Sequence, residues 1–216
     1  METATLVPGL KLDELEIGAL KSHELEEAVA LLSRGMRDNP LHVVAFGDDA
    51  ERRRQRIEKL FLATARTFNW ADHMVVARDE SGAIVGVCGT PPPGTCLPTP
   101  IEQIRMLPTL LGLGPSTTAR TLRWLAAWAK HDPETPHWHF GPLAVDFHLQ
   151  GKGIGSALLR VFCARMDAAG ADAYLETDKA INVDFYRKFG FEVVAEEDVI
   201  GVPCWYMMRR ASNDDQ

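Results

Sequence analysis

The stretch Gln150-Gly-Lys-Gly-Ile-Gly155 follows a run of strand character over residues 137–145 and decides the fold. Behind it, Ile154, Leu158 and Phe162 recur at a spacing of four and predict one buried stripe of a helix. Glycines at a strand-to-helix turn let the backbone approach a ligand closely, and the free amides of a helix start attract anions. The stretch therefore predicts an anion-binding loop inside an α/β fold.

Spacing separates the nucleotide-binding motifs that compete for this loop. A Walker loop needs Gly-Lys-Ser/Thr, but Gly153 follows Lys152. A Rossmann fingerprint needs a third glycine where Ser156 stands, and it belongs to the first strand of a βαβ series. What remains is Gln-x-x-Gly-x-Gly, read at Gln150, Gly153 and Gly155. A purely structural tight turn is the alternative.

The surrounding segments predict a mixed α/β layer architecture. After the loop, the helix continues to about residue 169 with Gly170 as its cap. A strand, a helix and two strands follow, over 173–177, 181–189, 191–199 and 204–209.

The N-terminal part predicts a strand, two helices and a hairpin. Ser22 is the expected N-cap of the first helix, and Asn39-Pro40 is expected to break the pattern. The charged run at 51–56 is interpreted as a solvated face of the second helix, with a phosphate site as the weaker alternative. The expected elements are a strand over 15–19, helices over 22–36 and 49–68, strands over 73–78 and 83–90, and two apolar helices between 100 and 130.

Composition sets the class of protein. The 216 residues fit one domain over 1–216, with a leader at 1–11, a tail at 211–216 and a helical insertion at 97–131. A formal net charge of -7 argues against nucleic acid as a partner. We expect a cytoplasmic protein without a membrane span, because no signal-length or membrane-length apolar run is present.

The cysteines predict neither a disulfide framework nor a metal site. Cys88, Cys96, Cys163 and Cys204 are widely scattered, with no Cys-x-x-Cys pair and no paired histidine motif.

Several segments around the loop resemble the GNAT family of acyl-CoA-dependent N-acyltransferases. They are Gly141-Pro-Leu-Ala-Val-Asp146, Ile154-Gly-Ser-Ala-Leu-Leu159, Tyr174-Leu-Glu-Thr177 and Asn182-Val-Asp-Phe-Tyr-Arg-Lys-Phe-Gly-Phe191, together with the loop itself. The C-terminal half is similar to puromycin N-acetyltransferase-like members. The resemblance implies a mixed, mostly antiparallel sheet that is splayed between two central parallel strands, with helices on both faces.

The resemblance also implies acetyl-CoA as the acyl donor and assigns residues to it. The pantetheine arm would pair with the main chain of the strand, and the diphosphate would lie on the loop amides. Asn182 is either a helix cap or a hydrogen-bond partner of the cofactor. The assigned residues are Leu143, Ala144, Val145, Gln150, Gly151, Lys152, Gly153, Ile154, Gly155, Ser156, Asn182 and Tyr186.

Acetyl transfer needs a base, an oxyanion donor and an acid for the leaving thiolate. By resemblance, Tyr186 is the acid, although a packed core tyrosine is the alternative. Glu176 is the candidate base, directly or through water, and a buried structural carboxylate is its alternative. The amide of Val145 or a neighbour would bind the oxyanion. His137 and His139 share one strand face and are either titrating groups or packing residues.

The expected function is transfer of an acetyl group from acetyl-CoA to a primary amine of a small molecule, by direct attack in a ternary complex. Cys88, Cys163 and Cys204 fall within strand or helix patterns, which argues against an acyl-cysteine. Trp124 and Trp128 either wall an acceptor pocket or pack in the core. The alternatives are a protein N-terminal or lysine acetyltransferase and a non-catalytic acyl-CoA-binding module. We expect a monomer or homodimer.

Overall fold

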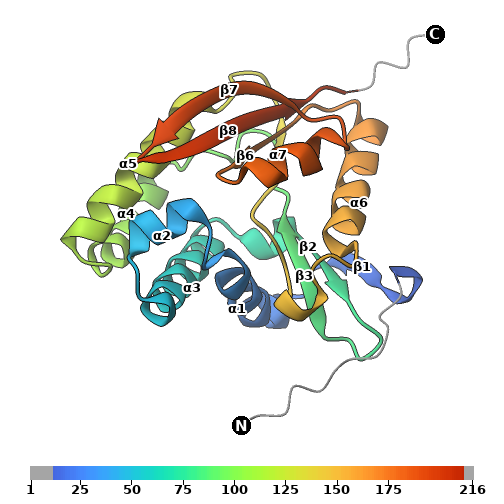
Figure 1. The fold of residues 1–216 in the computed structure, drawn as a ribbon, viewed down its shortest axis with the longest axis horizontal. Helices are drawn as coiled ribbons and strands as arrows, with labels where there is room; N and C mark the ends of the chain where they lie inside the picture. The colour runs from blue at the N-terminus through green and yellow to red at the C-terminus, as the bar shows by residue number, and fades with distance from the viewer. Residues whose placement is uncertain (1–11, 212–216) are drawn as a thin grey trace.

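Two four-stranded sheets form the middle of the molecule in the computed structural model, which describes residues 12–211 (Figure 1). The first sheet is antiparallel in the order β1-β2-β3-β5. The second has the order β4-β6-β8-β7, in which only β4 and β6 are parallel. The strands are β1 (Glu16–Ala19), β2 (Met74–Arg78), β3 (Ile84–Gly89), β4 (Trp138–His139), β5 (Leu143–Val145), β6 (Ala173–Thr177), β7 (Glu192–Val199) and β8 (Val202–Arg209).

The single strand expected over 137–145 is divided between the two sheets. The amide of Phe140 donates to the Tyr174 carbonyl on β6 at 2.8 Å, whereas the next amide, that of Gly141, donates to Gly89 on β3 at 3.0 Å. The crossing is tight, because a Cβ added to Gly89 would lie 2.4 Å from the Gly141 carbonyl oxygen. These bonds alternate between the two sheets, since the His139 amide also donates to the Pro91 carbonyl after β3 at 3.0 Å, whereas from Leu143 onward β5 pairs with β3 and no longer with β6. The predicted splayed sheet is confirmed.

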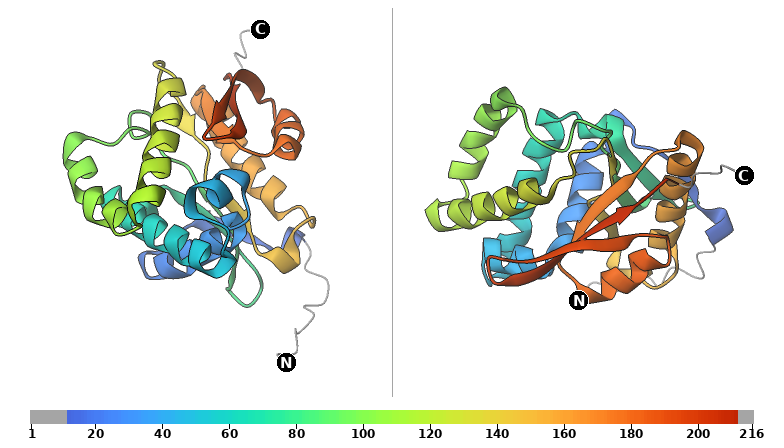
Figure 2. Two further views of the ribbon diagram at one scale, coloured as in Figure 1. Left: turned by 60° about the vertical axis from the view of Figure 1, so that its left-hand side comes forward. Right: turned by 90° about the horizontal axis from the view of Figure 1, so that it is seen from above.

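Seven α-helices cover the two sheets in the described part of the chain. Helix α6 (Ile154–Ala169) packs against β2 and β3 of the first sheet and β6 and β8 of the second, so it bridges both. Figures 1 and 2 place α6 and the pair α4 and α5 at opposite ends of the molecule. The remaining helices are α1 (Leu25–Met36), α2 (Pro40–Phe46), α3 (Ala50–Thr67), α4 (Pro100–Leu111), α5 (Pro115–His131) and α7 (Ala180–Arg187).

Three buried clusters fill the spaces between these layers. One lies under α6 and α7, one joins α2, α4 and α5 to β6 and β8, and one joins α1 to the first sheet. Strand β6 contributes to two of them, because Leu175 faces α6 while Tyr174 faces α2 and α5. The three residues of the predicted α6 stripe are at most 2% exposed, which confirms that helix face.

Some local expectations were wrong. The expected break at Asn39-Pro40 is confirmed, because α1 ends at Met36, but the sequence did not predict that Pro40 opens a further helix, α2, at its first turn, where the missing amide costs nothing. Residues Ser22–Glu24 form a short 3-10 helix, and the cap interaction is made by Glu24, which accepts the Lys21 amide at 2.7 Å. Arg53, from the run interpreted as solvated, is 5% exposed and donates to the carbonyls of Arg37 and Gly47 at 2.6 Å.

The expected leader and nearly all of the expected tail lie outside the described residues. Within residues 12–211, none of the helices has the length and apolar character needed to cross a bilayer. Helices α4 and α5 occupy the segment expected as a helical insertion, between β3 and β4.

Candidate active site

The separation of β5 from β6 leaves one edge of β5 without a neighbouring strand in the described part of the chain. On its other edge, the Pro142 carbonyl accepts the Gly89 amide at 3.0 Å, and the Asp146 amide donates to Val85 at 2.9 Å. Main-chain groups alternate in direction along a strand, so those of Leu143 and Val145 point away from β3 and into the opening. The Gln150 side chain donates to the Val145 carbonyl at 3.3 Å, which ties the glycine loop to this edge.

The glycine loop ends where the opening meets the start of α6. Gly151 and Gly153 have φ values of 76° and 88°, the left-handed region in which glycine is strongly preferred. The first helical hydrogen bond runs from the Ala157 amide to the Gly153 carbonyl at 2.9 Å. The amides of Ile154, Gly155 and Ser156 therefore have no partner within the helix.

The chemistry of this helix start suits an anion. The first turn of α6 contains no acidic residue, and its N-cap, Gly153, supplies no side chain to the free amides. Lys152 is exposed beside them. Three unpaired amides at the positive end of a helix dipole fit a diphosphate group.

Tyr186 lies on α7, against the point where the strand changes sheets. Its ring centroid lies 6.3 Å from that of Phe140 and 6.0 Å from that of Phe191, and the residue is 7% exposed. Burial raises the pKa of Tyr186 above its usual value, so the hydroxyl keeps its proton at neutral pH. Tyr186 is thus packed in the core, as the alternative to an acid role predicts. Its hydroxyl is nevertheless protonated, as a general acid must be.

Asn182 does not cap α7. Lys179 holds the N-cap position, and the Asn182 side chain donates to the Thr177 hydroxyl at 3.2 Å. The capping alternative is therefore wrong, and the hydrogen-bonding role toward a cofactor stays a prediction.

Glu176 and His139 form an ion pair of 2.9 Å across β4 and β6. Their side chains are 4% and 18% exposed, so the pair is largely shielded from water. Burial by itself would lower the pKa of His139, but the Glu176 carboxylate and the Cys96 thiol raise it to about 10. His139 is therefore a charged partner of the candidate base and not simply a packing residue.

Glu176 and Tyr186 lie on opposite faces of the second sheet. Leu175 packs in the cluster that contains Tyr186, whereas Tyr174 packs in the cluster of α2 and α5. Because strand side chains alternate, Glu176 shares the face of Tyr174. The candidate acid and base thus flank the opening from its two sides.

A comparison with protein families decides the identity. The model of the Acetyltransferase (GNAT) family matches residues 39–191, more than two thirds of the chain.

This chain belongs to the GNAT family.

As a GNAT protein it is an acetyltransferase that uses acetyl-CoA as its acyl donor. The free edge of β5 and the unpaired amides at the start of α6 fit the two parts of that donor, the amide-bearing arm and the diphosphate. The implied enzyme class and cofactor are confirmed. The finer resemblance to puromycin N-acetyltransferase-like members stays a prediction.

Solved structures share the GNAT fold at low sequence identity. A Corynebacterium glutamicum structure described as histone acetyltransferase HPA2 and related acetyltransferase is 20% identical, with a TM-score of 0.72 over 94% of this chain and 99% of that one. The Drosophila melanogaster polyamine N-acetyltransferase, which forms N-acetylagmatine, is 15% identical, with a TM-score of 0.63 over 91% and 99%. A Brucella melitensis GNAT acetyltransferase in complex with acetyl-CoA is 16% identical, with a TM-score of 0.52 over 94% and 91%.

The face of the second sheet that carries Glu176 also packs against a group of aromatic residues whose polar atoms lack hydrogen-bond partners within residues 12–211. The ring centroid of Trp124 lies 4.9 Å from that of His42 and 5.1 Å from that of Trp128. His42 Nδ1, both indole nitrogens and the Tyr206 hydroxyl are buried without a hydrogen-bond partner among residues 12–211. Burial lowers the pKa of His42 to about 3, so its ring is neutral. Sequence reasoning missed His42, because it lies in the segment expected to break a helix.

Cys96 is the other residue that the sequence left without a role. Cys88, Cys163 and Cys204 are buried as expected, and burial raises the pKa of each thiol. Cys96 is only partly buried and lies 3.5 Å from His137, so it is the cysteine next to the candidate site.

Proposed function

We propose that this GNAT protein transfers the acetyl group of acetyl-CoA to a primary amine of a small molecule by direct attack in a ternary complex. The observation that carries the proposal is the placement of Glu176 and Tyr186 on opposite faces of β6, beside the opening between β5 and β6. One face offers a buried carboxylate to an amine, and the other offers a protonated hydroxyl to a leaving group.

In this proposal, the donor arm lies along Leu143, Ala144 and Val145, with Asn182 as a further contact. Of the loop amides from Gln150 to Ser156, those of Gln150 and Lys152 already donate to the Phe147 and Leu149 carbonyls, so the amides at the start of α6, with the side chain of Lys152, hold the diphosphate. Acetyl-CoA supplies an activated thioester. The residues of the chain align that thioester with the face that carries Glu176.

The chain's own groups then move the protons. Glu176 removes a proton from the acceptor amine, directly or through water, while His139 fixes the carboxylate at 2.9 Å. The Val145 amide, which points into the opening, stabilises the oxyanion. Tyr186 donates its proton to the leaving thiolate, and no covalent acyl-enzyme is needed.

The buried polar atoms beside Glu176 favour a small acceptor over a protein chain. Each of them lacks a partner among the described residues, and a buried polar group without one costs free energy. A compact acceptor that carries hydrogen-bonding atoms as well as an amine would satisfy them. The Drosophila relative that forms N-acetylagmatine is an example of a GNAT enzyme with such an acceptor.

The test is a mass-spectrometric screen of the full chain with acetyl-CoA and two acceptor libraries, one of small amines and one of peptides. Acetylation of small amines without acetylation of peptides supports the proposal. Peptide acetylation would make the chain a protein acetyltransferase, and acetyl-CoA binding without turnover on either library would make it a binding module. Both outcomes contradict the proposal.

A second experiment tests direct attack. The protein is incubated with radiolabelled acetyl-CoA in the absence of acceptor and then denatured. We expect no covalent label. Label that disappears in Cys96→Ala but persists in Cys163→Ala would show an acyl-cysteine route instead.

A further inference from the structure

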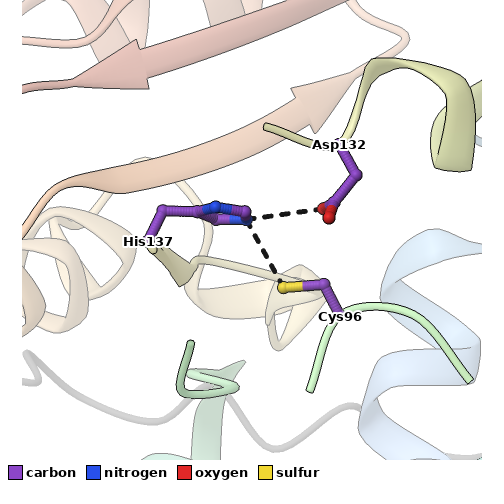
Figure 3. Close-up of side chains that lie close together, drawn as sticks. All are labelled: Cys96, Asp132 and His137. Carbon is purple, nitrogen blue, oxygen red and sulfur yellow. Dashed lines mark hydrogen bonds and ion pairs between the residues drawn. The ribbon is translucent and has the colours of Figure 1, made fainter. Parts of the chain in front are cut away.

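Three side chains from separate parts of the chain converge at the end of the molecule where β4 begins. Figure 3 shows Cys96, Asp132 and His137 pointing toward one another. Cys96 follows the turn after β3, Asp132 directly follows α5, and His137 directly precedes β4. The Cys96 Sγ atom lies 3.5 Å from His137 Nε2, and Asp132 Oδ1 lies 3.4 Å from the same nitrogen. The three atoms all lie within 4.8 Å of one another.

The tautomer of His137 follows from its other nitrogen. His137 Nδ1 lies 2.8 Å from the Thr135 carbonyl oxygen, which can only accept a hydrogen bond. Nδ1 must therefore carry the proton, and in the neutral ring Nε2 presents a lone pair. That lone pair faces a thiol sulfur and a carboxylate oxygen.

In this tautomer three electron-pair donors from separate segments converge on one point. A metal cation between them would satisfy all three at once. A histidine whose second nitrogen donates to a backbone carbonyl is also the usual arrangement at metal sites.

The two separations that involve His137 match a tetrahedral ion. Zinc bonds of about 2.3 Å to sulfur and about 2.05 Å to nitrogen place those two atoms about 3.6 Å apart at the tetrahedral angle. The same calculation gives about 3.4 Å between nitrogen and oxygen ligands. The observed distances of 3.5 and 3.4 Å lie within about 0.1 Å of these values.

We propose that Cys96, Asp132 and His137 form a site for a divalent transition metal, with zinc as the preferred ion. A mixed set of sulfur, nitrogen and oxygen ligands favours zinc over calcium or magnesium, which prefer oxygen alone. Three ligands from the chain leave the fourth position to water. Cys96 and Asp132 are only partly buried, so the ion and its water reach the site from solvent.

The metal would hold three segments of the chain together. It would fix the turn after β3 and the end of α5 to β4, the strand whose His139 pairs with Glu176. This site does not depend on the acceptor proposed above, because metal binding is measured without acetyl-CoA or an amine.

The first experiment uses the untagged full chain after removal of metals with a chelator. Zinc or cobalt is added, excess ion is removed, and metal per chain is measured by mass spectrometry. We expect one equivalent, a cobalt spectrum with tetrahedral bands and a thiolate charge-transfer band, and a higher melting temperature with zinc. Absence of bound metal overturns the proposal.

Matched variants locate the site. Cys96→Ser, Asp132→Asn and His137→Gln should each raise the dissociation constant for cobalt by at least about tenfold. Cys163→Ser and His148→Gln remove one cysteine and one exposed histidine away from the cluster and should bind cobalt as the natural sequence does. Equal binding in the three cluster variants contradicts the proposal.

A measurement on the unmodified chain covers the case in which a cluster variant fails to fold. The protein is alkylated with and without zinc, and the modified peptide is identified by mass spectrometry. We expect zinc to slow alkylation of Cys96 at least about tenfold, in line with ligand occupancy. Alkylation of Cys96 at the same rate in both samples would indicate a thiol hydrogen-bonded to histidine without a metal, which overturns the proposal.

Discussion

At the residue scale, the proposed chemistry depends on two side chains with different surroundings. Glu176 is paired with His139 at 2.9 Å, whereas Tyr186 is packed among aromatic rings that raise its pKa. Burial keeps the Tyr186 phenol in its neutral state, whereas His139 fixes the position of the Glu176 carboxylate. The two groups therefore have different surroundings on the two faces of the sheet.

Removing the Tyr186 hydroxyl tests the acid role. We expect Tyr186→Phe to lower kcat about 100-fold or more, because a positioned acid contributes about that factor. Acetyl-CoA affinity, measured by calorimetry, should not change, since the ring still packs against Phe140.

Tyr174→Phe is the matched control. It removes a hydroxyl that donates to the His131 carbonyl on the other face of the sheet. This variant should lose stability with little change in kcat. An unchanged kcat in Tyr186→Phe would leave Tyr186 as a core residue only.

At the element scale, the start of α6 combines two functions. Its unpaired amides and positive dipole serve the diphosphate, and the same dipole would accept an acidic side chain from the protein. The absence of an acidic residue in this first turn keeps the position open for a ligand. An acidic side chain in the first turn of α6 should therefore weaken diphosphate binding and stabilise the helix.

That opposition can be measured with Ser156→Asp. We expect the dissociation constant for acetyl-CoA to rise about tenfold, equivalent to ~1.4 kcal/mol, because a carboxylate would compete with the diphosphate. The melting temperature should stay the same or rise slightly, because the carboxylate suits the helix dipole. Ser156→Asn is the uncharged control. Equal affinities in the two variants would show that the diphosphate lies elsewhere.

A buried ion pair connects the short helix at 22–24 to β2. Arg78 donates from two nitrogens to Glu24 at 3.0 and 2.6 Å, and both side chains are at most 10% exposed. The hydrogen bond from Arg78 is the main cause that lowers the pKa of Glu24 from 4.5 to about 2. A carboxylate with a lowered pKa stabilises the fold fully above its ordinary value and loses that contribution as the pH falls toward 2.

Glu24→Gln should therefore cost about 3–5 kcal/mol near neutral pH, since it leaves a buried guanidinium without its main partner. The difference from the natural sequence should shrink as the pH falls from 4.5 toward 2. Urea unfolding at a series of pH values measures both. Glu80→Gln, on the exposed turn after β2, is the control and should show no such difference. A difference that is independent of pH would contradict this assignment.

At the scale of the whole molecule, α6 joins two sheets that share no strand pairing. Leu158 is fully buried in the cluster that contains Val85 of the first sheet and Leu175 of the second. Main-chain hydrogen bonds from residues 139–141 link the two sheets at one end of the opening between β5 and β6. Helix α6 supplies a second connection, directly beside the donor site.

Leu158→Ala tests this connection. We expect a loss of about 2–5 kcal/mol in the free energy of unfolding, from lost burial and the resulting cavity. Unfolding in urea should remain a single transition, because both sheets depend on the same cluster. Leu122→Ala, at a position on α5 that is 48% exposed, should be nearly neutral. Two separate transitions would show that the sheets unfold independently.

The sequence by itself determined the local features of this protein. The glycine loop, the buried stripe of α6, the hairpin of β2 and β3 and the Gly170 cap all follow from residues close together in the chain, so spacing and backbone preference were sufficient. The family resemblance rested on the same kind of local pattern.

Only the tertiary structure decided which distant residues meet. Four features join separate elements: the separation of β5 from β6, the pairing of Glu176 with His139, the aromatic group around His42, and the cluster of Cys96, Asp132 and His137. Side-chain spacing along one element carries no information on what faces it from another, because that contact is set by how whole layers pack.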